Sequence, residues 1–131
     1  MKALNQYAAV NAQTSVVDVD RHKLIELLYD GALERINMAK ARILAKDYEA
    51  KNKFINKTID ILAGLRSFID ESKAEELADN LAQLYAYCES RLLEANLKND
   101  VELLDEVASH IRTVREGWAG IRSEAEAQGL I

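Results

Sequence analysis

Hydrophobic positions recur along this chain at the spacing of α-helices. The clearest case is the segment of residues 21–45, whose apolar residues fill an arc of about 140° when successive residues advance by about 100°. An ordinary surface helix buries a stripe of only about 100°. We therefore expect this helix to pack against two or three others.

Three further segments show the same periodicity. Helices are predicted over residues 20–45, 48–70, 72–97 and 99–121, and residues 123–131 are expected to be a fraying helix end. Asp47, Ser72 and Asn99 can cap the second, third and fourth helices, the last two with a glutamate three residues on. The connections are short, and short connections force antiparallel neighbours. The predicted fold class is all-α: an antiparallel up-down-up-down four-helix bundle with a short N-terminal segment.

Residues 1–19 form a separate region before this bundle. Leu4, Tyr7, Ala8 and Asn11 have helical spacing, but an isolated helix this short is marginal in water. Two interpretations stay open: a frayed tail, or a detachable flap that docks Leu4 and Tyr7 onto an apolar groove. The predicted domain organisation is a segment or flap over residues 1–19 and one bundle domain over residues 20–131.

Composition agrees with this fold and narrows the class of partner. The chain has 131 residues, no proline, and a net charge of −5. The single cysteine excludes an internal disulfide and fits a reducing cytosol. No apolar run is long enough for a signal peptide or a membrane span. We expect a cytoplasmic protein without membrane insertion, and the negative charge argues against nucleic acid as a partner.

Reactive groups are sparse. Glu106 and His110 are spaced like half of a di-metal site, but no second pair exists, and solvated side chains are the alternative. His22 lies at the polar start of the first helix. Lysines at positions 51, 53 and 57 are expected to form a solvated basic face. The sequence predicts no catalytic residue, no metal and no cofactor, and hence not an enzyme.

A four-helix bundle could also carry a phosphorylatable histidine. Such a site needs an exposed histidine with small and basic residues one turn on, and Arg112 and Thr113 follow His110. This match is poor. Histidine phosphotransfer signalling is nevertheless the alternative function, because the fold would suit it.

The most informative feature is an excess of apolar surface. The second and fourth helices show apolar arcs of about 180° and about 160°, wider than one four-helix core uses. The spare surface could close a weak homodimer or receive an amphipathic helix from another protein. The alternative is that these residues are half-covered at the edges of the core.

Short motifs add to the periodicity. Leu-Tyr-Asp-Gly-Ala occupies residues 28–32, Asn-Leu-x-x-Leu-Tyr occupies residues 80–85, and Arg-Glu-Gly-Trp occupies residues 115–118. On these motifs and an early Tyr7, the chain resembles the FliS family of flagellar secretion chaperones over nearly its whole length. Members often have a proline just before the first helix, where this chain reads Val19-Asp20.

The resemblance implies a bundle that binds the C-terminal segment of newly made flagellin, which is disordered when free. Binding would prevent premature polymerisation, and the complex would be delivered to an export gate component of the flagellar type III export apparatus without ATP. The N-terminal segment would cover part of the same surface. Combining the wide apolar arcs with the family motifs, we predict these partner-binding residues: Leu4, Tyr7, Ile25, Tyr29, Ile55, Leu62, Leu81, Tyr85, Leu92 and Trp118. For each of them, ordinary core is the alternative.

Overall fold

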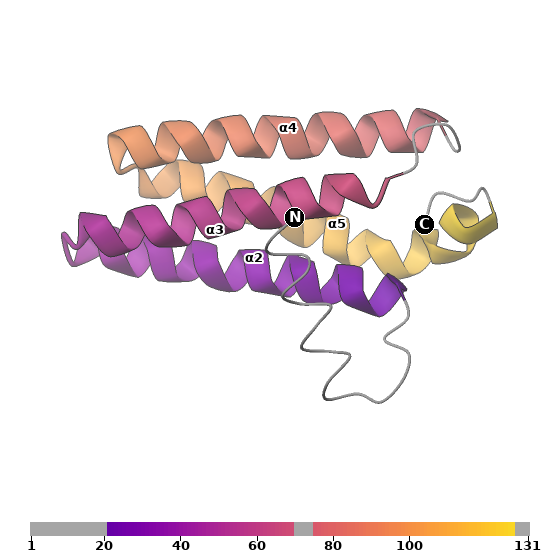
Figure 1. Ribbon diagram of the computed structural model, residues 1–131, viewed down its shortest axis with the longest axis horizontal. Coiled ribbons are helices and arrows are strands. Elements are labelled where there is room, and N and C mark those ends of the chain that lie inside the picture. The colour runs from indigo at the N-terminus through magenta and orange to yellow at the C-terminus, as the bar shows by residue number, and fades with distance from the viewer. Residues whose placement is uncertain (1–20, 70–74, 128–131) are drawn as a thin grey trace.

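The computed structural model describes the backbone of residues 21–69 and 75–127, and the side chains within residues 21–69 and 75–118. The described residues form the helices α2 (Arg21–Leu44), α3 (Tyr48–Ser67), α4 (Glu75–Lys98) and α5 (Val101–Ala127). Figure 1 shows them side by side, with the α2–α3 and α4–α5 turns at the same end. The predicted all-α fold and helix order are confirmed. The predictions for Leu4, Tyr7 and the Ser72 cap lie outside the described residues.

The helices form a ring in which each packs against two neighbours. Among the described residues α2 contacts α3 and α5, and α4 contacts the same two helices, whereas the diagonal pairs make no close backbone contact. Each connection reverses the chain direction, so all neighbours are antiparallel. This arrangement is a four-helix bundle.

Two turns of the same design close one end of the bundle. Lys46 and Asn99 follow α2 and α4 with left-handed backbone angles, φ of 60° and 53°. The backbone N–H of the next residue reaches back to the last full turn of the helix, at 2.8 Å for Asp47 and 3.0 Å for Asp100. This Schellman pattern satisfies carbonyl groups that would otherwise lack partners at the helix end.

The aspartate after each left-handed residue caps the following helix. Asp47 accepts from the backbone N–H of Ala50 at 3.2 Å, as predicted. Asp100 accepts from the backbone N–H of Glu102 at 2.9 Å and caps α5. The predicted cap at Asn99 is wrong, because the left-handed conformation of Asn99 ends α4 and does not begin α5.

Two other helix ends differ from prediction. The second predicted helix was expected to end at residue 70, but α3 ends at Ser67. Phe68 and Ile69 form a tighter turn with hydrogen bonds to carbonyls three residues back. In contrast, α5 continues to Ala127, although residues 123–131 were expected to be a fraying helix end. Within the described residues, no helix has the length and apolar character needed to cross a membrane.

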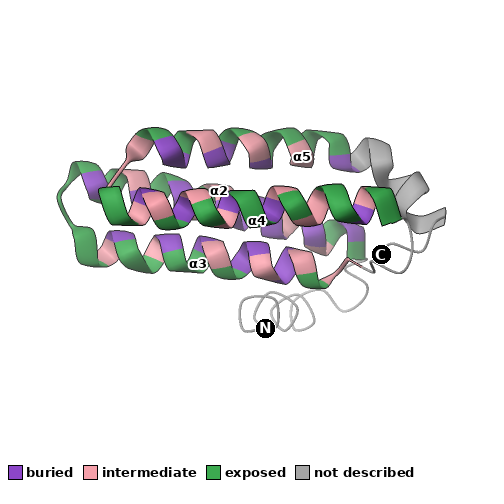
Figure 2. Ribbon diagram, turned by 90° about the horizontal axis from the view of Figure 1, so that it is seen from above, coloured by how far each residue is buried: buried purple, intermediate pink, exposed green. Residues whose placement is uncertain are grey.

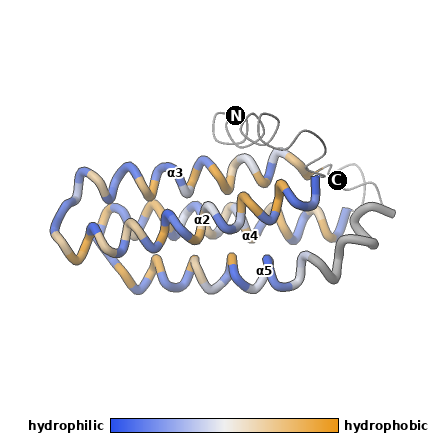
Figure 3. Tube along the Cα trace, turned by 90° about the horizontal axis from the view of Figure 1, so that it is seen from below, coloured by the Kyte–Doolittle hydropathy of each residue, from blue (hydrophilic) through white to orange (hydrophobic). Residues whose placement is uncertain are grey.

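The apolar stripes of the helices meet along the axis of the bundle. Figure 2 shows buried residues on the inward sides of the helices, and Figure 3 shows hydrophobic residues in the same places. Each fully buried large apolar side chain contributes about 1.5–3 kcal/mol relative to exposure. The large apolar residues with the least exposure are Leu28, Tyr29, Ile36, Ile55, Ile61, Leu62, Leu92, Leu104, Val107 and Trp118.

One member of the predicted solvated basic face is in fact buried. Lys51 is 4% exposed, and its Nζ donates to the backbone carbonyl of Asn96 at 2.9 Å. Burial lowers the pKa of Lys51. A cation placed on the last turn of α4 complements the negative end of that helix, so Lys51 ties the start of α3 to the end of α4.

Candidate functional site

A small apolar cavity lies at the end of the bundle opposite the two Schellman turns. Its volume is about 10 Å³, enough for about one water molecule. Residues of all four helices and of the turn after α3 line it: Ile25, Tyr29, Leu65, Phe68, Ile69, Leu81, Tyr85 and Trp118. The fold thus gathers half of the predicted partner-binding residues around one cavity.

Helical spacing explains how the cavity walls are built. Ile25 and Tyr29 are four residues apart on α2, and Leu81 and Tyr85 are four residues apart on α4. Residues at this spacing lie one above the other on the same face of a helix. The two pairs therefore face each other from diagonally opposite helices.

A hydrogen bond joins these two walls. The hydroxyl oxygens of Tyr29 and Tyr85 lie 2.6 Å apart, and both side chains are buried. Burial raises the pKa of Tyr29 to about 12, and burial together with Tyr29 raises the pKa of Tyr85. Both phenols therefore stay neutral at physiological pH, and each satisfies the polar group of the other.

Trp118 closes the cavity from α5. Its Nε1 donates to the backbone carbonyl of His22 at 3.1 Å, and its ring stacks on the His22 ring with centroids 4.9 Å apart. It also meets the ring of Tyr29 edge-on at 6.5 Å. His22 was expected among the solvated side chains but is only 6% exposed, because the indole of Trp118 covers it.

The outer edge of the cavity is apolar and only half-buried. We call this surface the apolar rim: Phe68, Ile69 and Leu81 line the cavity, and Leu77 adjoins Ile69 and Leu81. The guanidinium of Arg21 lies 5.3 Å from the centre of the Phe68 ring, a cation–π contact. Leu77 and Leu81 also pack on the separate small cluster around the fully buried Ala78.

Sequence reasoning missed part of this rim. Phe68 and Ile69 were recognised as apolar but were assigned to a continuing helix and not to a binding surface. After α3 ends at Ser67, both side chains line the cavity, and Ile69 packs against Ala78 of α4. The packing of Leu77 and Leu81 on Ala78 was not predicted either, although their helical spacing was visible.

The remaining predicted partner-binding residues lie elsewhere. Ile55, Leu62 and Leu92 have no exposed surface and belong to the central core. Leu4 and Tyr7 precede the described residues. Ile25, Tyr29, Tyr85 and Trp118 are buried as well, so among the predicted residues that the structure describes only Leu81 is half-exposed, at the end of the bundle where the cavity lies.

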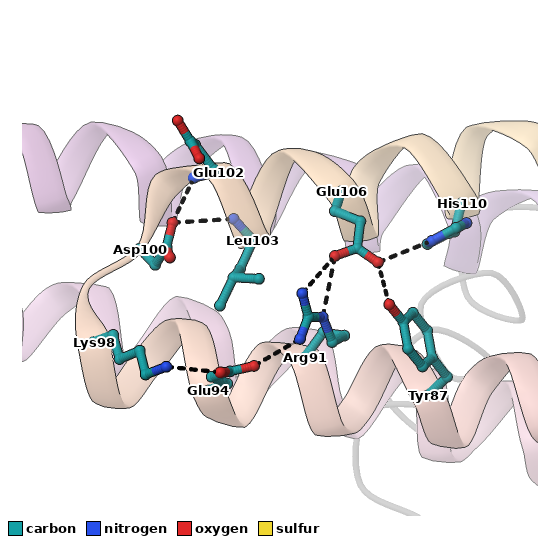
Figure 4. Close-up of polar contacts among 9 residues, drawn as sticks. All are labelled: Tyr87, Arg91, Glu94, Lys98, Asp100, Glu102, Leu103, Glu106 and His110. Carbon is teal, nitrogen blue, oxygen red and sulfur yellow. Dashed lines mark hydrogen bonds and ion pairs between the residues drawn. The ribbon is translucent and has the colours of Figure 1, made fainter.

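A polar cluster around Glu106 joins α4 to α5. Figure 4 shows the Glu106 carboxylate receiving hydrogen bonds from Tyr87 and Arg91, with His110 Nε2 3.2 Å away. The Tyr87 hydroxyl, more than any other partner, holds the pKa of Glu106 below its ordinary range. Because Glu106 is already bonded to these donors, this cluster is a bridge between helices.

The described residues offer neither a metal site nor a reactive thiol. Within residues 21–69 and 75–118, no group of three or more His, Cys, Asp and Glu side chains could hold a metal ion. Burial raises the pKa of the Cys88 thiol to about 11, so it is protonated at neutral pH. The apolar cavity and its rim are the candidate site.

Comparison with known families gives this site a context. The model of the family described as "Flagellar protein FliS" matches residues 3–125. The chain belongs to the FliS family. It is 43% identical over 121 residues to the flagellar secretion chaperone FliSB of Pseudomonas aeruginosa, covering 92% of this chain and 96% of that protein.

More distant relatives agree. The FliS flagellar secretion chaperone of Salmonella typhimurium is 36% identical over 126 residues, covering 95% of this chain and 93% of that protein. The one from Bacillus subtilis is 33% identical over 125 residues, covering 95% and 92%. Membership of the FliS family supports a role as a flagellar export chaperone, in a family of chaperones and not of enzymes.

The FliS-like motifs of this chain meet at the cavity. Tyr29 comes from the Leu-Tyr-Asp-Gly-Ala motif and Tyr85 from the Asn-Leu-x-x-Leu-Tyr motif, and both line the cavity with Trp118 of the Arg-Glu-Gly-Trp motif. The first and last motifs are also joined by an ion pair, with Arg115 Nε 2.5 Å from Asp30 Oδ1. Segments that are distant in the sequence thus build one site.

Proposed function

We propose that this FliS-family chain binds the disordered C-terminal segment of flagellin in the cytoplasm and prevents its premature polymerisation. The loaded chain then delivers flagellin to an export gate component of the flagellar type III export apparatus. The convergence of the family motifs on an apolar cavity with a half-exposed rim is the observation that carries this proposal. Relatives named flagellar secretion chaperones also support it.

The proposed client-binding surface is the apolar rim with the cavity behind it. An amphipathic client helix would place apolar residues on Phe68, Ile69 and Leu81, at the i, i+3, i+4 and i+7 spacing typical of helix-in-groove recognition. The cavity itself, at about 10 Å³, is too small for a client side chain. Deeper insertion requires the turn carrying Phe68 and Ile69 to move outward.

Binding of this kind must also order the client. Coupled folding of a disordered segment costs about 2–5 kcal/mol of the gross contact energy. This cost keeps a complex with a large apolar contact reversible, as unloading at an export gate requires. Leu4 and Tyr7 of the N-terminal segment are proposed to cover the rim before the client arrives.

The test is a titration of the flagellin C-terminal segment onto the full chain and its variants. Trp118 is the only tryptophan in the chain and lies in the cavity wall, so its fluorescence reports events at this site. Tyr7→Ala and Tyr29→Ala test the predicted residues, and Leu81→Glu places a charge on the rim. We expect weaker binding in all three, and the largest loss in Leu81→Glu.

Leu97→Glu is the matched control, because Leu97 is 83% exposed at the opposite end of the bundle. Circular dichroism establishes that each variant is folded before its affinity is compared. Wild-type affinity in folded Tyr7→Ala and Tyr29→Ala would reject the assignment of the predicted residues. Equal losses in Leu81→Glu and Leu97→Glu would reject the rim as the client surface.

A further inference from the structure

A groove on the outside of α2 and α3 takes no part in the proposed client site. It consists of two adjoining hollows of about 360 and 330 Å³, which share Met38, Ala50 and Phe54. No residue of this groove lines the cavity at the end of the bundle. We call it the α2/α3 groove.

The floor of the α2/α3 groove is apolar and accessible. Met38 is 39% exposed, and Phe54 is half-buried against the core. Ala41 and Ala50 widen the groove because their side chains are short. A flexible methionine beside an aromatic ring can adapt to side chains of different shape.

The edges of this groove carry mostly positive charge. Its basic lining residues are Arg35, Arg42, Lys53 and Lys57. Glu34 is the acidic residue among the lining residues, and Asp47 lies 3.9 Å from Arg42. The groove is therefore locally cationic in a chain whose net charge is −5. A basic surface on an acidic protein attracts an acidic partner and discriminates among partners by charge.

We propose that the α2/α3 groove binds an acidic amphipathic helix of a partner protein, at the same time as the client site is occupied. The lining residues span positions 34–42 on α2 and 50–57 on α3, about 12 Å or two helical turns. A helix of this length places one or two apolar side chains over Met38 and Phe54. Carboxylates on both flanks of that helix then face the basic edges, a charge complementarity that an entirely apolar helix lacks.

The probe is a dye-labelled synthetic amphipathic helix with leucine on one face and glutamate on its flanks. A matched peptide carries lysine in place of every glutamate. Fluorescence anisotropy of each peptide is followed as the full chain is added. We expect the acidic peptide to bind at least about tenfold more tightly than the basic one and to weaken as salt is raised.

Two variants test whether the labelled peptide binds in the groove. Met38→Glu puts a negative charge on the floor, and Lys53→Glu reverses a charge at the edge. We expect a loss of about tenfold or more for the first and about threefold for the second. Leu97→Glu and Arg112→Glu make the same changes at exposed positions outside the groove and should stay within about twofold of wild type.

The results that would reject this proposal differ from those that would reject the proposed client site. Equal binding of both peptides, no binding of the acidic peptide, or wild-type affinity in Met38→Glu would overturn the proposal. Competition between the peptide and the flagellin segment would assign the groove to the client instead. Self-association in light scattering that Met38→Glu abolishes would assign it to a second copy of the chain. Unchanged flagellin binding in Met38→Glu is the expected result.

Discussion

Tyr29 and Tyr85 join their hydroxyl groups across the diagonal of the bundle, at an oxygen–oxygen distance of 2.6 Å. Their helices, α2 and α4, make no close backbone contact within the described residues, so these long side chains provide the link. Because both come from motifs of the FliS family, the same bond couples the packing of the core to the wall of the candidate site.

Removing one of these hydroxyl groups leaves the other buried without its partner. We expect Tyr29→Phe and Tyr85→Phe each to lower the free energy of unfolding by about 1–3 kcal/mol. The double variant should lose less stability than the two single variants summed, because each single change removes the same hydrogen bond. Urea unfolding of the four proteins measures this cycle, with the exposed Tyr48→Phe as a control. Simple additivity would contradict a shared hydrogen bond.

Trp118 should be among the most sensitive positions in the chain. Trp118→Ala removes a buried ring and its bond to the carbonyl of His22, at an expected cost of about 3–5 kcal/mol. His22→Ala removes the stacked imidazole but keeps that carbonyl, so it should cost less. Thermal unfolding ranks the two variants against the exposed Leu97→Ala, which should change little. The reverse order for Trp118→Ala and His22→Ala would contradict the assigned bond.

The α4–α5 turn makes opposite predictions for two adjacent residues. Asp100→Ala should destabilise the protein by about 0.5–2 kcal/mol, because it removes the N-cap of α5. Asn99→Gly should be neutral or stabilising by up to about 1 kcal/mol, because glycine adopts the left-handed conformation without strain. Urea midpoints decide between them. If Asn99→Gly lowered the stability and Asp100→Ala left it unchanged, Asn99 and not Asp100 would be the N-cap of α5.

Acid sensitivity should depend on Glu106. Its pKa in the folded chain lies below the ordinary value of 4.5, chiefly because Tyr87 donates to the carboxylate. A depressed pKa stabilises the fold above pH 4.5, and this stabilisation is lost as the pH falls through the folded-state value. Glu106→Gln should therefore be less stable than wild type at pH 6, and the difference should shrink toward pH 3. Exposed Glu116→Gln controls for net charge, and a pH-independent difference in Glu106→Gln would contradict the bridge.

Periodicity predicted what depends on one helix at a time. The apolar spacing of residues 21–45 predicted a helix over almost the bounds of α2, and Asp47 was recognised as a cap because its bond is local. The short motifs containing Tyr29, Tyr85 and Trp118, together with an early Tyr7, predicted the family. Each helix, cap and motif depends on residues within a few positions of one another.

Contacts between distant segments were beyond such reasoning. His22 and Lys51 were both expected to be exposed to solvent, because neighbouring residues in the sequence are polar. One is covered by Trp118, 96 positions away, and the other reaches Asn96, 45 positions away. A helical wheel says how wide an apolar face is, but not which helix covers it.

The sequence alone determined an all-α bundle, its helix order and its family, because these follow from local periodicity and short motifs. Only the tertiary structure decided that Ile55 and Leu92 fill the core while Phe68 and Leu81 remain half-exposed. The reason is that burial depends on four helices together. An apolar residue is covered or left open according to where its neighbours end, and α3 ends at Ser67, beside the start of α4.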